Sequence, residues 1–299
     1  MNRKFIYFIN PISGTKNKKR LLDIIEKKTT AQHIPFEILY TNAEGNYSYL
    51  IPKIAAEKIT DIIICGGDGT VNQITQFLLG ADVNVGIIPM GSGNGLAFAA
   101  KIPKKITKAL QVIFNNNVAY IDGFYINRQF SCMLCGLGFD AQIAHDFARQ
   151  KKRGLFTYIK LTIKNLFRAK PYAFQIEIEN QEMNTEAFFI SIANSNQFGN
   201  NFTIAPQASL GDGLLDIVIV NKMNKVRLVW SLLKQIYTGQ LYSYENKKFQ
   251  RRKIYYFQLK KIVIQNPQNA PLHIDGEPVH TTTHFEIKIV EKAFRLLQP

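Results

Sequence analysis

Residues 61–70 read Asp-Ile-Ile-Ile-Cys-Gly-Gly-Asp-Gly-Thr, and this stretch decides the fold of the first part of the chain. The apolar run 62–65 is continuous and mostly β-branched, which is typical of a strand buried on both faces of a parallel sheet. Glycines then end the strand in a tight turn, and the pattern after them predicts a helix over 70–79. A strand that leads through such a turn into a helix indicates an α/β sheet with helices on both faces.

The same order of strand, turn and helix recurs on both sides of this stretch. The sequence predicts strands at 5–9, 36–40 and 83–88, and helices at 18–28, at 47–58 and from residue 96 onward. Three of the strands lead into small polar turns that contain glycine, at 10–14, 66–70 and 91–95. Ligands of an open α/β sheet lie beyond the carboxyl ends of its strands, so we expect all three turns to line one crevice.

The composition of these turns indicates what they bind. Glycine permits left-handed backbone and a close approach of the ligand, while free amides at the start of the next helix attract phosphate oxygens. The turns therefore predict a polyphosphate cradle. None of them has the G-x-x-x-x-G-K-[ST] spacing of a P-loop, and the first does not fit G-x-G-x-x-G. P-loop NTPases and dinucleotide oxidoreductases are therefore disfavoured.

After about residue 122 the pattern changes. Short runs rich in β-branched and aromatic residues predict a mainly antiparallel β-sandwich, interrupted by helices at 155–168 and 226–237. A chain of 299 residues exceeds the size at which a single core usually stops growing. We therefore expect two domains. A Rossmann-like nucleotide-binding α/β domain spans 1–122, completed by the C-terminal segment 288–299, and the β-sandwich spans 123–287.

The motif Gly-Gly-Asp-Gly-Thr at 66–70, after an apolar strand, resembles the nucleotide-binding signature of the diacylglycerol kinase catalytic domain. That superfamily includes sphingosine and ceramide kinases and, more distantly, NAD kinases and phosphofructokinases, so the motif alone does not give the substrate. The resemblance extends along most of the chain, through Asn10-Pro11 with Ser13-Gly14, Thr41, 89–94, 138–141, 211–216 and 275–277. This ordered set is similar to the lipid-kinase branch.

The resemblance implies that ATP and Mg²⁺ are the cofactors and that the nucleotide lies in the cleft between the two domains. The residues implied to bind ATP are Asn10, Pro11, Ser13, Gly14, Thr41, Gly66, Gly67, Asp68, Gly69, Thr70, Gly91, Ser92, Gly93 and Asn94. One residue departs from the pattern. Many bacterial diacylglycerol kinases have an aspartate after the asparagine of the third turn, whereas this chain has Gly95, as sphingosine and ceramide kinases more often do. The identity of the lipid and the effect of Gly95 on metal binding stay open.

Asp68 lies at the end of a predicted strand, where a carboxylate is well placed to contact Mg²⁺ directly or through water. Mg²⁺ in proteins binds few carboxylates and keeps several of its waters. The alternative is that Asp68 only caps the helix predicted over 70–79. Capping does not account for the flanking glycines, so the metal interpretation is preferred.

Asp275 and Glu277 supply two carboxylates one residue apart, which point the same way if the backbone is extended. In the family that the chain resembles, a carboxylate of this motif is the base that takes the proton of the lipid hydroxyl. Phosphoryl transfer uses such an acceptor together with Mg²⁺, which offsets charge. The alternative is an Asp-Gly hairpin turn with solvated acids. The choice of base among Asp275, Glu277 and Asp68 stays open.

The resemblance also implies a structural Mg²⁺ at the Asp-Gly turn before the predicted strand 214–220. Asp212 would bind this ion, together with backbone carbonyl groups around Ser209 and Leu214. Asp216 is a less favoured ligand. Either aspartate could instead be an ordinary turn residue.

The charge of the chain, +15, favours anionic partners such as lipid headgroups and nucleotide phosphates. Basic residues gather in a predicted amphipathic helix over 149–170 and in a cluster over 247–253. Such a helix can lie on an anionic membrane surface or pack on the sandwich. No nucleic-acid recognition motif accompanies these residues. No run approaches the roughly 18 apolar residues of a spanning helix, and the three cysteines suit buried thiols in a reducing compartment.

These observations predict a cytoplasmic, peripherally membrane-associated, ATP-dependent lipid kinase that phosphorylates a hydroxyl group of diacylglycerol or of a sphingoid-type lipid, with no nucleic-acid partner. Two alternatives stay open. One is an NAD kinase-like enzyme, against which Asn72 is followed by Gln73 where an Asn-Glu pair is expected. The other is a nucleotide-dependent membrane-binding protein with a degenerate site. The oligomeric state is open, with a dimer among the options.

Overall fold

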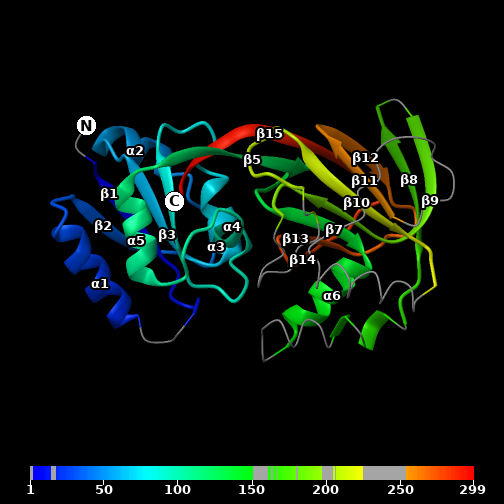
Figure 1. Cartoon of the computed structure of the whole chain (residues 1–299), viewed down its shortest axis with the longest axis horizontal. Helices are drawn as coiled ribbons and strands as arrows, with labels where there is room; N and C mark the ends of the chain where they lie inside the picture. The colour runs from blue at the N-terminus through cyan, green and yellow to red at the C-terminus, as the bar shows by residue number, and fades with distance from the viewer. Residues whose placement is uncertain are drawn as a thin grey trace. The chain divides into compact units, whose positions relative to one another are not determined.

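The computed structural model describes residues 3–14, 18–150, 161–162, 164–166, 168–179, 181–196, 205, 207–224 and 254–299. Contacts between residues divide the chain into two units (Figure 1). Unit 1 consists of Met1–Asp122 with Glu291–Pro299, and unit 2 consists of Gly123–Val290. Two strands, β5 (Val118–Ile126) and β15 (His284–Leu297), contribute residues to both units.

Unit 1 contains a parallel sheet in the order β4-β3-β1-β2. Its strands are β1 (Phe5–Ile9), β2 (Phe36–Tyr40), β3 (Asp61–Gly66) and β4 (Asn84–Pro89). The end of β15 pairs with β4 in parallel, with Arg295 opposite Asn84. Every residue of β1 and β3 is buried, so the apolar runs of the sequence form the central strands. The predicted parallel α/β fold is confirmed.

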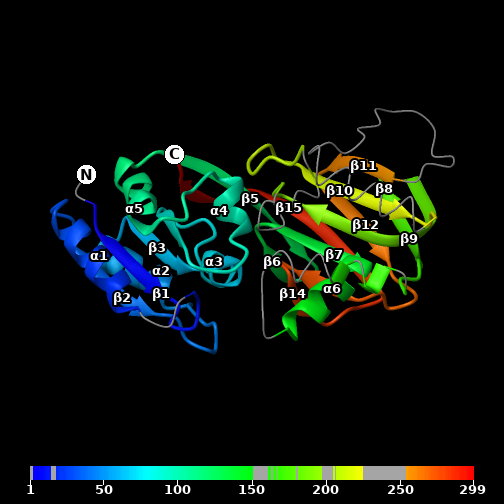
Figure 2. The same cartoon turned by 60° about the horizontal axis from the view of Figure 1, so that its bottom comes forward.

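The described helices of unit 1 are α1 (Lys19–Thr30), α2 (Leu50–Glu57), α3 (Asp68–Thr75), α4 (Gly95–Ala99) and α5 (Ile106–Asn115). Helices α1 and α5 contact each other (Figure 2). Helix α5 also packs on β4. Helix α5 was not predicted, although its buried residues Ala109, Leu110 and Ile113 repeat at helical spacing.

The sequence predicts a helix that begins at residue 47, but α2 begins at Leu50. The residue at 47 is a tyrosine whose buried ring packs edge-on against Phe8 and Phe77, so it belongs to the core beside the helix. Pro52 then falls in the first turn of α2, where a missing amide costs no hydrogen bond within the helix.

A buried ion pair fixes the first residues of the central strands. The carboxylate of Asp61, at the start of β3, accepts hydrogen bonds from Arg3 Nη2 at 2.6 Å and from Arg3 Nε at 3.1 Å. Asn84, at the start of β4, donates to the same carboxylate at 3.2 Å. Asp61 is fully buried, so these bonds replace its hydration. They hold the amino edge of the sheet, at the opposite end of the strands from the glycine-containing turns.

Unit 2 is built of antiparallel strands, as predicted. The long strand β9 (Gln181–Ala193) pairs with β7 (Leu134–Gly138), β8 (Tyr172–Ile178) and β10 (Leu215–Asn221). Strand β10 also pairs with β11 (Ile254–Leu259), and β12 (Lys261–Gln265) pairs with both β8 and β15. Buried apolar residues of these strands form one core, which includes Phe174, Ile190, Ile217 and Phe285.

Several short elements of unit 2 were not predicted. They are β6 (Gln129–Ser131), β7, α6 (Phe139–Ala148), β13 (Leu272–Ile274) and β14 (Glu277–Val279). Helix α6 follows β7 directly and packs against β7, β13 and β14 (Figure 1). Of the helix predicted over 155–168, residues 161–162 and 164–166 are described and helical. The predicted helix 226–237 and the basic cluster 247–253 lie outside the described residues.

Among the helices within the described ranges, none is both long and apolar enough to cross a membrane. Cys65, Cys132 and Cys135 are all buried and form no disulfide, which confirms that they are thiols of the core.

Candidate functional site

The three turns predicted to cradle phosphates follow β1, β3 and β4 at the carboxyl edge of the sheet in unit 1. Asn10 Nδ2 donates a hydrogen bond to Thr70 Oγ1 at 2.8 Å, which joins the first turn to the second. The Met90 amide donates to the Gly66 carbonyl oxygen at 2.8 Å, which joins the second turn to the third. The turns therefore lie together in one place.

Close contacts between backbones explain several of the glycines. A Cβ atom added at Gly91 would lie 2.6 Å from Cα of Gly67, and one added at Gly67 would lie 3.0 Å from Cα of Gly91. Gly14 has a φ of +67°, and a Cβ atom there would lie 2.8 Å from the carbonyl oxygen of Met90. These three glycines allow the turns to pack against one another. The packing of the protein itself therefore requires them, whether or not a ligand binds.

Asp68 caps a helix, but not its own. Its Oδ2 accepts a hydrogen bond from the Gly95 amide at 3.0 Å, and its Oδ1 accepts one from the Leu96 amide at 3.3 Å. These amides begin α4, so the expectation that they are free to bind phosphate is wrong. Burial raises the pKa of Asp68, and the amide hydrogen bonds oppose that rise. Gly93 leaves room for this arrangement, because a Cβ atom there would lie 3.0 Å from Asp68 Oδ2.

The side chains of Asn94 and Thr70 shape the turns. Asn94 is buried with a φ of +56°; its Oδ1 accepts from the Gly91 amide and its Nδ2 donates to the Gly91 carbonyl oxygen, each at 2.7 Å. Thr70 is buried, and a Cβ atom at Gly66 would lie 2.6 Å from Cβ of Thr70. The polar atoms of both side chains thus form hydrogen bonds within the three turns.

The N-terminus of α3 has no side-chain cap. Its N-cap residue is Gly67, which offers no side-chain acceptor to the amides of the first turn. Gly69, in that first turn, has no protein atom within 4 Å of the position that a Cβ atom would occupy. Amides at a helix N-terminus that lie beside open space are the usual site for an anion. Of the predicted contacts to phosphate, this one is favoured most by the geometry.

The remaining residues predicted to bind ATP lie in or beside the same turns. Pro11 and Ser92 are exposed, and half-buried Ser13 donates from Oγ to a carbonyl oxygen of its own turn at 3.2 Å. Thr41 follows β2, and its amide donates to the Ile9 carbonyl oxygen at 3.0 Å. Thr41 therefore lies next to the first turn, and its part in nucleotide binding stays a prediction.

The motif 275–277 lies in a hairpin of unit 2 and not in extended backbone. Strands β13 and β14 pair with Ile274 opposite Glu277, which leaves Asp275 and Gly276 as a two-residue turn. Their φ angles are +52° and +80°, as a type I′ turn requires at its two central positions. The two carboxylates therefore do not project from an extended strand. The motif forms the Asp-Gly hairpin of the alternative, but of its two acids only Glu277 is exposed, whereas that alternative expected both to be exposed.

Asp275 and Glu277 have different surroundings in this hairpin. Asp275 Oδ1 accepts hydrogen bonds from Ser131 Oγ at 2.6 Å and from the Leu134 amide at 3.1 Å. The Asp275 amide donates to the Leu134 carbonyl oxygen at 2.9 Å, so the residue is held at the start of β7. Glu277 is exposed. A proton acceptor must be accessible, and Glu277 is the more accessible of the two carboxylates, while Asp275 anchors the hairpin. The choice of base stays a prediction.

The turn before β10 carries two aspartates that differ in burial. Asp212 is exposed, and its Oδ1 accepts from the Leu214 amide at 3.1 Å. Asp216 is fully buried, and its Oδ1 accepts from the Tyr256 hydroxyl and from Gln258 Nε2, the latter at 3.1 Å. Asp216 Oδ2 has no hydrogen-bond partner in the described part of the chain. Burial raises the pKa of Asp216 to about 6.

These surroundings fit a cation. A buried carboxylate oxygen without a partner, near a second carboxylate, is costly unless a positive charge approaches it. Ser209 and Leu214 flank the turn, as the prediction of carbonyl ligands requires. Asp216, which the sequence disfavoured as a ligand, therefore fits an ion better than exposed Asp212 does. Within the described ranges no group of three or more His, Cys, Asp or Glu side chains could hold a metal, but Mg²⁺ needs few carboxylates.

Comparisons with known proteins agree with both units. The sequence matches the diacylglycerol kinase catalytic domain over residues 4–126, and it matches the YegS C-terminal NAD kinase beta sandwich-like domain over residues 134–298. A diacylglycerol kinase of Bacillus subtilis is 26% identical, over 90% of this chain and 88% of that protein. An uncharacterized protein of Synechocystis is 28% identical, over 97% of this chain and 69% of that protein.

A solved structure shares the fold. The crystal structure of a diacylglycerol kinase from Bacillus anthracis strain Sterne matches with a TM-score of 0.73 at 20% identity, covering 100% of this chain and 97% of that chain. The two family matches follow one another along the chain, the first over the parallel sheet and the second over the antiparallel strands. The chain therefore belongs to the diacylglycerol kinase catalytic-domain family, with a YegS-type β-sandwich as its C-terminal domain.

Proposed function

We propose that this protein is an ATP- and Mg²⁺-dependent lipid kinase that transfers the γ-phosphoryl group to a hydroxyl group of diacylglycerol or of a sphingoid-type lipid. The observation that carries the proposal is the contact among the three turns at the carboxyl edge of the sheet, beside the uncapped N-terminus of α3. The relative that is named a diacylglycerol kinase supports the same class of reaction.

The phosphates of ATP are proposed to bind at the first turn of α3, where Gly69 leaves open space. When bound, Mg²⁺ neutralises negative charge on the phosphates and on the group being transferred. Asp68 is the carboxylate of this edge that would hold the ion, with water completing the coordination. Because Asp68 also caps α4, the same side chain connects the metal to the third turn.

In the proposed transfer, the oxygen of the lipid hydroxyl forms a bond to the γ-phosphorus. The bond from this phosphorus to the oxygen shared with the β-phosphate breaks, and ADP leaves with that electron pair. The hydroxyl proton passes to the exposed carboxylate of Glu277. Asp275 keeps the hairpin in place through Ser131 and Leu134, which holds Glu277 in one backbone position.

A second cation is proposed at the turn before β10, held by Asp216 and Asp212 with carbonyl groups near Ser209 and Leu214. The unpartnered oxygen of buried Asp216 supports this site. Isothermal titration of metal-free protein with Mg²⁺ should detect a site that survives Asp68→Asn and disappears in Asp216→Asn. Equal binding by both variants would contradict the assignment.

The central experiment uses a total lipid extract with enzyme and Mg²⁺-ATP, followed by mass spectrometry for lipids that have gained a phosphoryl group. NAD is offered in a parallel reaction, because NAD kinases share the GGDGT motif. The proposal expects a phosphorylated lipid, no phosphorylated NAD, and no product when Mg²⁺ is chelated. Phosphorylation of NAD alone, or tight ATP binding without any lipid product, would overturn it.

The role of Asp68 needs a matched pair of variants. Asp68→Ala removes both the negative charge and the cap of α4, so a loss of activity would be ambiguous. Asp68→Asn removes the charge and keeps one acceptor oxygen, so it retains one of the two amide hydrogen bonds of the cap. The metal role expects Asp68→Asn to lose activity while its thermal midpoint falls less than that of Asp68→Ala. Parental activity in Asp68→Asn would remove Asp68 from the metal site.

A lipid acceptor also requires contact with a membrane. We infer that the protein works in the cytoplasm and binds anionic membrane surfaces peripherally, which its charge of +15 supports. Sedimentation with vesicles tests this: binding should require anionic lipid and weaken as salt rises. Equal sedimentation with neutral vesicles would contradict an electrostatic mode of binding.

A further inference from the structure

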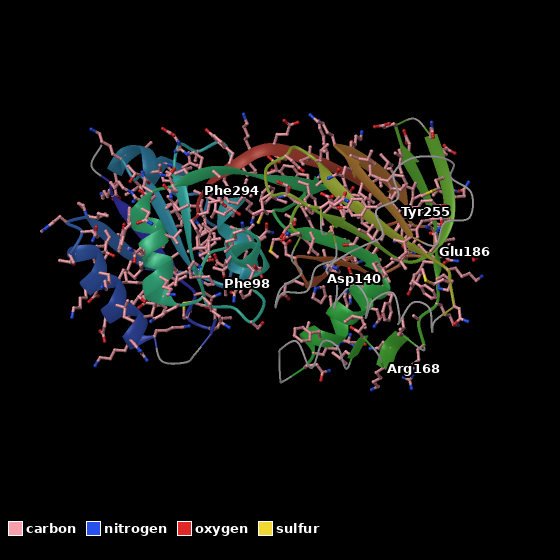
Figure 3. All side chains as sticks on the ribbon, in the orientation of Figure 1. Phe98, Asp140, Arg168, Glu186, Tyr255 and Phe294 are labelled. Atoms are coloured by element: carbon pink, nitrogen blue, oxygen red, sulfur yellow. The ribbon has the colours of Figure 1, made fainter. Side chains whose placement is uncertain are left out.

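A buried histidine lies between α6 and the hairpin that carries Glu277. His273, on β13, has no exposed surface. Its Nε2 lies 3.1 Å from Oδ2 of Asp140. Asp140, which Figure 3 labels, is in the first turn of α6 and is also buried. The Nδ1 of His273 accepts a hydrogen bond from the amide of Gly276 at 3.3 Å. One side chain thus connects a helix to the turn of the hairpin.

The fold makes specific room for this pair. In the register of β7 with β13, Gly136 lies directly opposite His273. A Cβ atom at Gly136 would lie 2.5 Å from both Asp140 Oδ2 and His273 Nε2. Gly138, with a φ of +87°, turns the chain from β7 into α6, which brings Asp140 back over the sheet. The pair therefore fills a space that a larger residue at 136 would close.

The chemistry of the pair fixes the state of the imidazole. An ionised carboxylate only accepts hydrogen bonds, so Asp140 requires that Nε2 carry the proton. Nδ1 is then the acceptor, as the donation from the Gly276 amide demands. Gly276 directly precedes Glu277. A change at Asp140 therefore alters the hydrogen bonding of His273, and through it the backbone that positions Glu277.

We propose that Asp140 and His273 are positioning residues for the phosphoryl transfer, which hold the turn 275–276 so that Glu277 presents its carboxylate in one orientation. The proposal rests on the proposed lipid kinase function. His273 itself is not a catalytic residue, because it is fully buried and both ring nitrogens are engaged. The alternative is that the pair only fills the core, in which case its hydrogen bonds would not affect the reaction.

Three variants separate these possibilities. Asp140→Asn keeps the size of the side chain but allows its amide to donate, which permits the proton to move to Nδ1 and oppose the Gly276 amide. His273→Phe keeps a ring and removes both hydrogen bonds. His273→Asn retains an acceptor near the position of Nδ1. His145→Phe is the control, since the hydrogen-bonding contact of His145 Nε2 is with the Leu272 carbonyl oxygen of the same strand, at 2.9 Å, and not with the turn 275–276.

Steady-state kinetics with Mg²⁺-ATP and the lipid substrate give the first readout. A displaced carboxylate is expected to lower kcat by about 100-fold in Asp140→Asn and His273→Phe, with KM for ATP unchanged within about twofold. His273→Asn should recover part of kcat, and the control should keep it. Parental kcat in both Asp140→Asn and His273→Phe would overturn the proposal, as would an equal loss in the control.

The second readout does not depend on activity. Nitrogen NMR of labelled parent protein should show His273 neutral, with the proton on Nε2, and the Gly276 amide should exchange slowly with solvent. In Asp140→Asn that amide should exchange faster. A proton on Nδ1 in the parent would overturn the proposal even if His273→Phe fails to fold. If the parent phosphorylates no lipid but the NMR result is as expected, the proposed function fails and the geometry of the turn stands.

Discussion

Among single residues, the glycines of the phosphate turns divide into two groups. Gly67 and Gly91 touch each other through their backbones, so each is required by the packing of the protein itself. Gly69 faces open space, and no contact within 4 Å explains it. A ligand that approaches the first turn of α3 would explain it. The two groups should therefore respond differently to the same substitution.

Gly69→Ala is expected to fold normally, because a methyl group meets nothing there and alanine favours a helix. ATP affinity should fall by about 10- to 100-fold, as expected when a hydrogen bond to a charged group is lost. Gly91→Ala is the matched control and should be destabilised by about 1–3 kcal/mol through backbone overlap with Gly67. Calorimetry with Mg²⁺-ATP and thermal melts measure both effects. Undiminished ATP affinity in Gly69→Ala would place the phosphates elsewhere.

Asp216 gives a prediction about pH at the same scale. Burial raises its pKa to about 6 from the ordinary aspartate value of 3.8, so between these values the folded state binds more protons than the unfolded state. Stability in the absence of metal should therefore fall as pH rises from about 4 to 6, by about 3 kcal/mol in all, and then level off. Urea unfolding in EDTA tests this, and Asp216→Asn should remove that part of the slope. An unchanged slope in Asp216→Asn would refute it.

At the scale of elements, the sequence predicted those whose pattern is local. The apolar runs of β1 and β3 are buried throughout and were found from composition alone. Strand β7 contains glycine at alternate positions, and β13 and β14 are only three residues long. None of the three therefore shows a clear alternation of apolar and polar residues. The partners of Asp68 lie 27 and 28 residues away, and Ser131 lies 144 residues from Asp275. No local pattern reports contacts at such separations.

The amino edge of the parallel sheet gives a prediction at this scale. Asp61→Ala leaves the Arg3 guanidinium and the Asn84 amide without their shared acceptor, and the free energy of unfolding should fall by about 3–5 kcal/mol. Asp82→Ala is the control, because the Asp82 side chain is 95% exposed in its pair with Arg295 and should contribute less than about 1 kcal/mol. Denaturant unfolding measures both variants. Similar losses in the two would mean that burial of Asp61 does not matter.

On the scale of the whole molecule, the chain has two units, and one cluster of buried apolar residues lies wholly within unit 2. Units of this size can unfold separately, so calorimetry is expected to show two transitions. Mg²⁺-ATP is proposed to bind unit 1, so it should raise the midpoint of the transition of unit 1. Asp216 belongs to unit 2, so Asp216→Asn should shift the midpoint of the other transition. A single transition that moves as a whole under both changes would show that the units unfold as one.

The space beside Gly136 also carries a consequence for evolution. Any side chain at this position would overlap the imidazole of His273 and the carboxylate of Asp140. A lineage that kept both polar side chains in place would have no room for alanine at 136, and a lineage that replaced both would have room for it. The three positions should thus covary across descendants of a common ancestor, and a homologue that combined alanine at 136 with both polar residues would contradict this expectation.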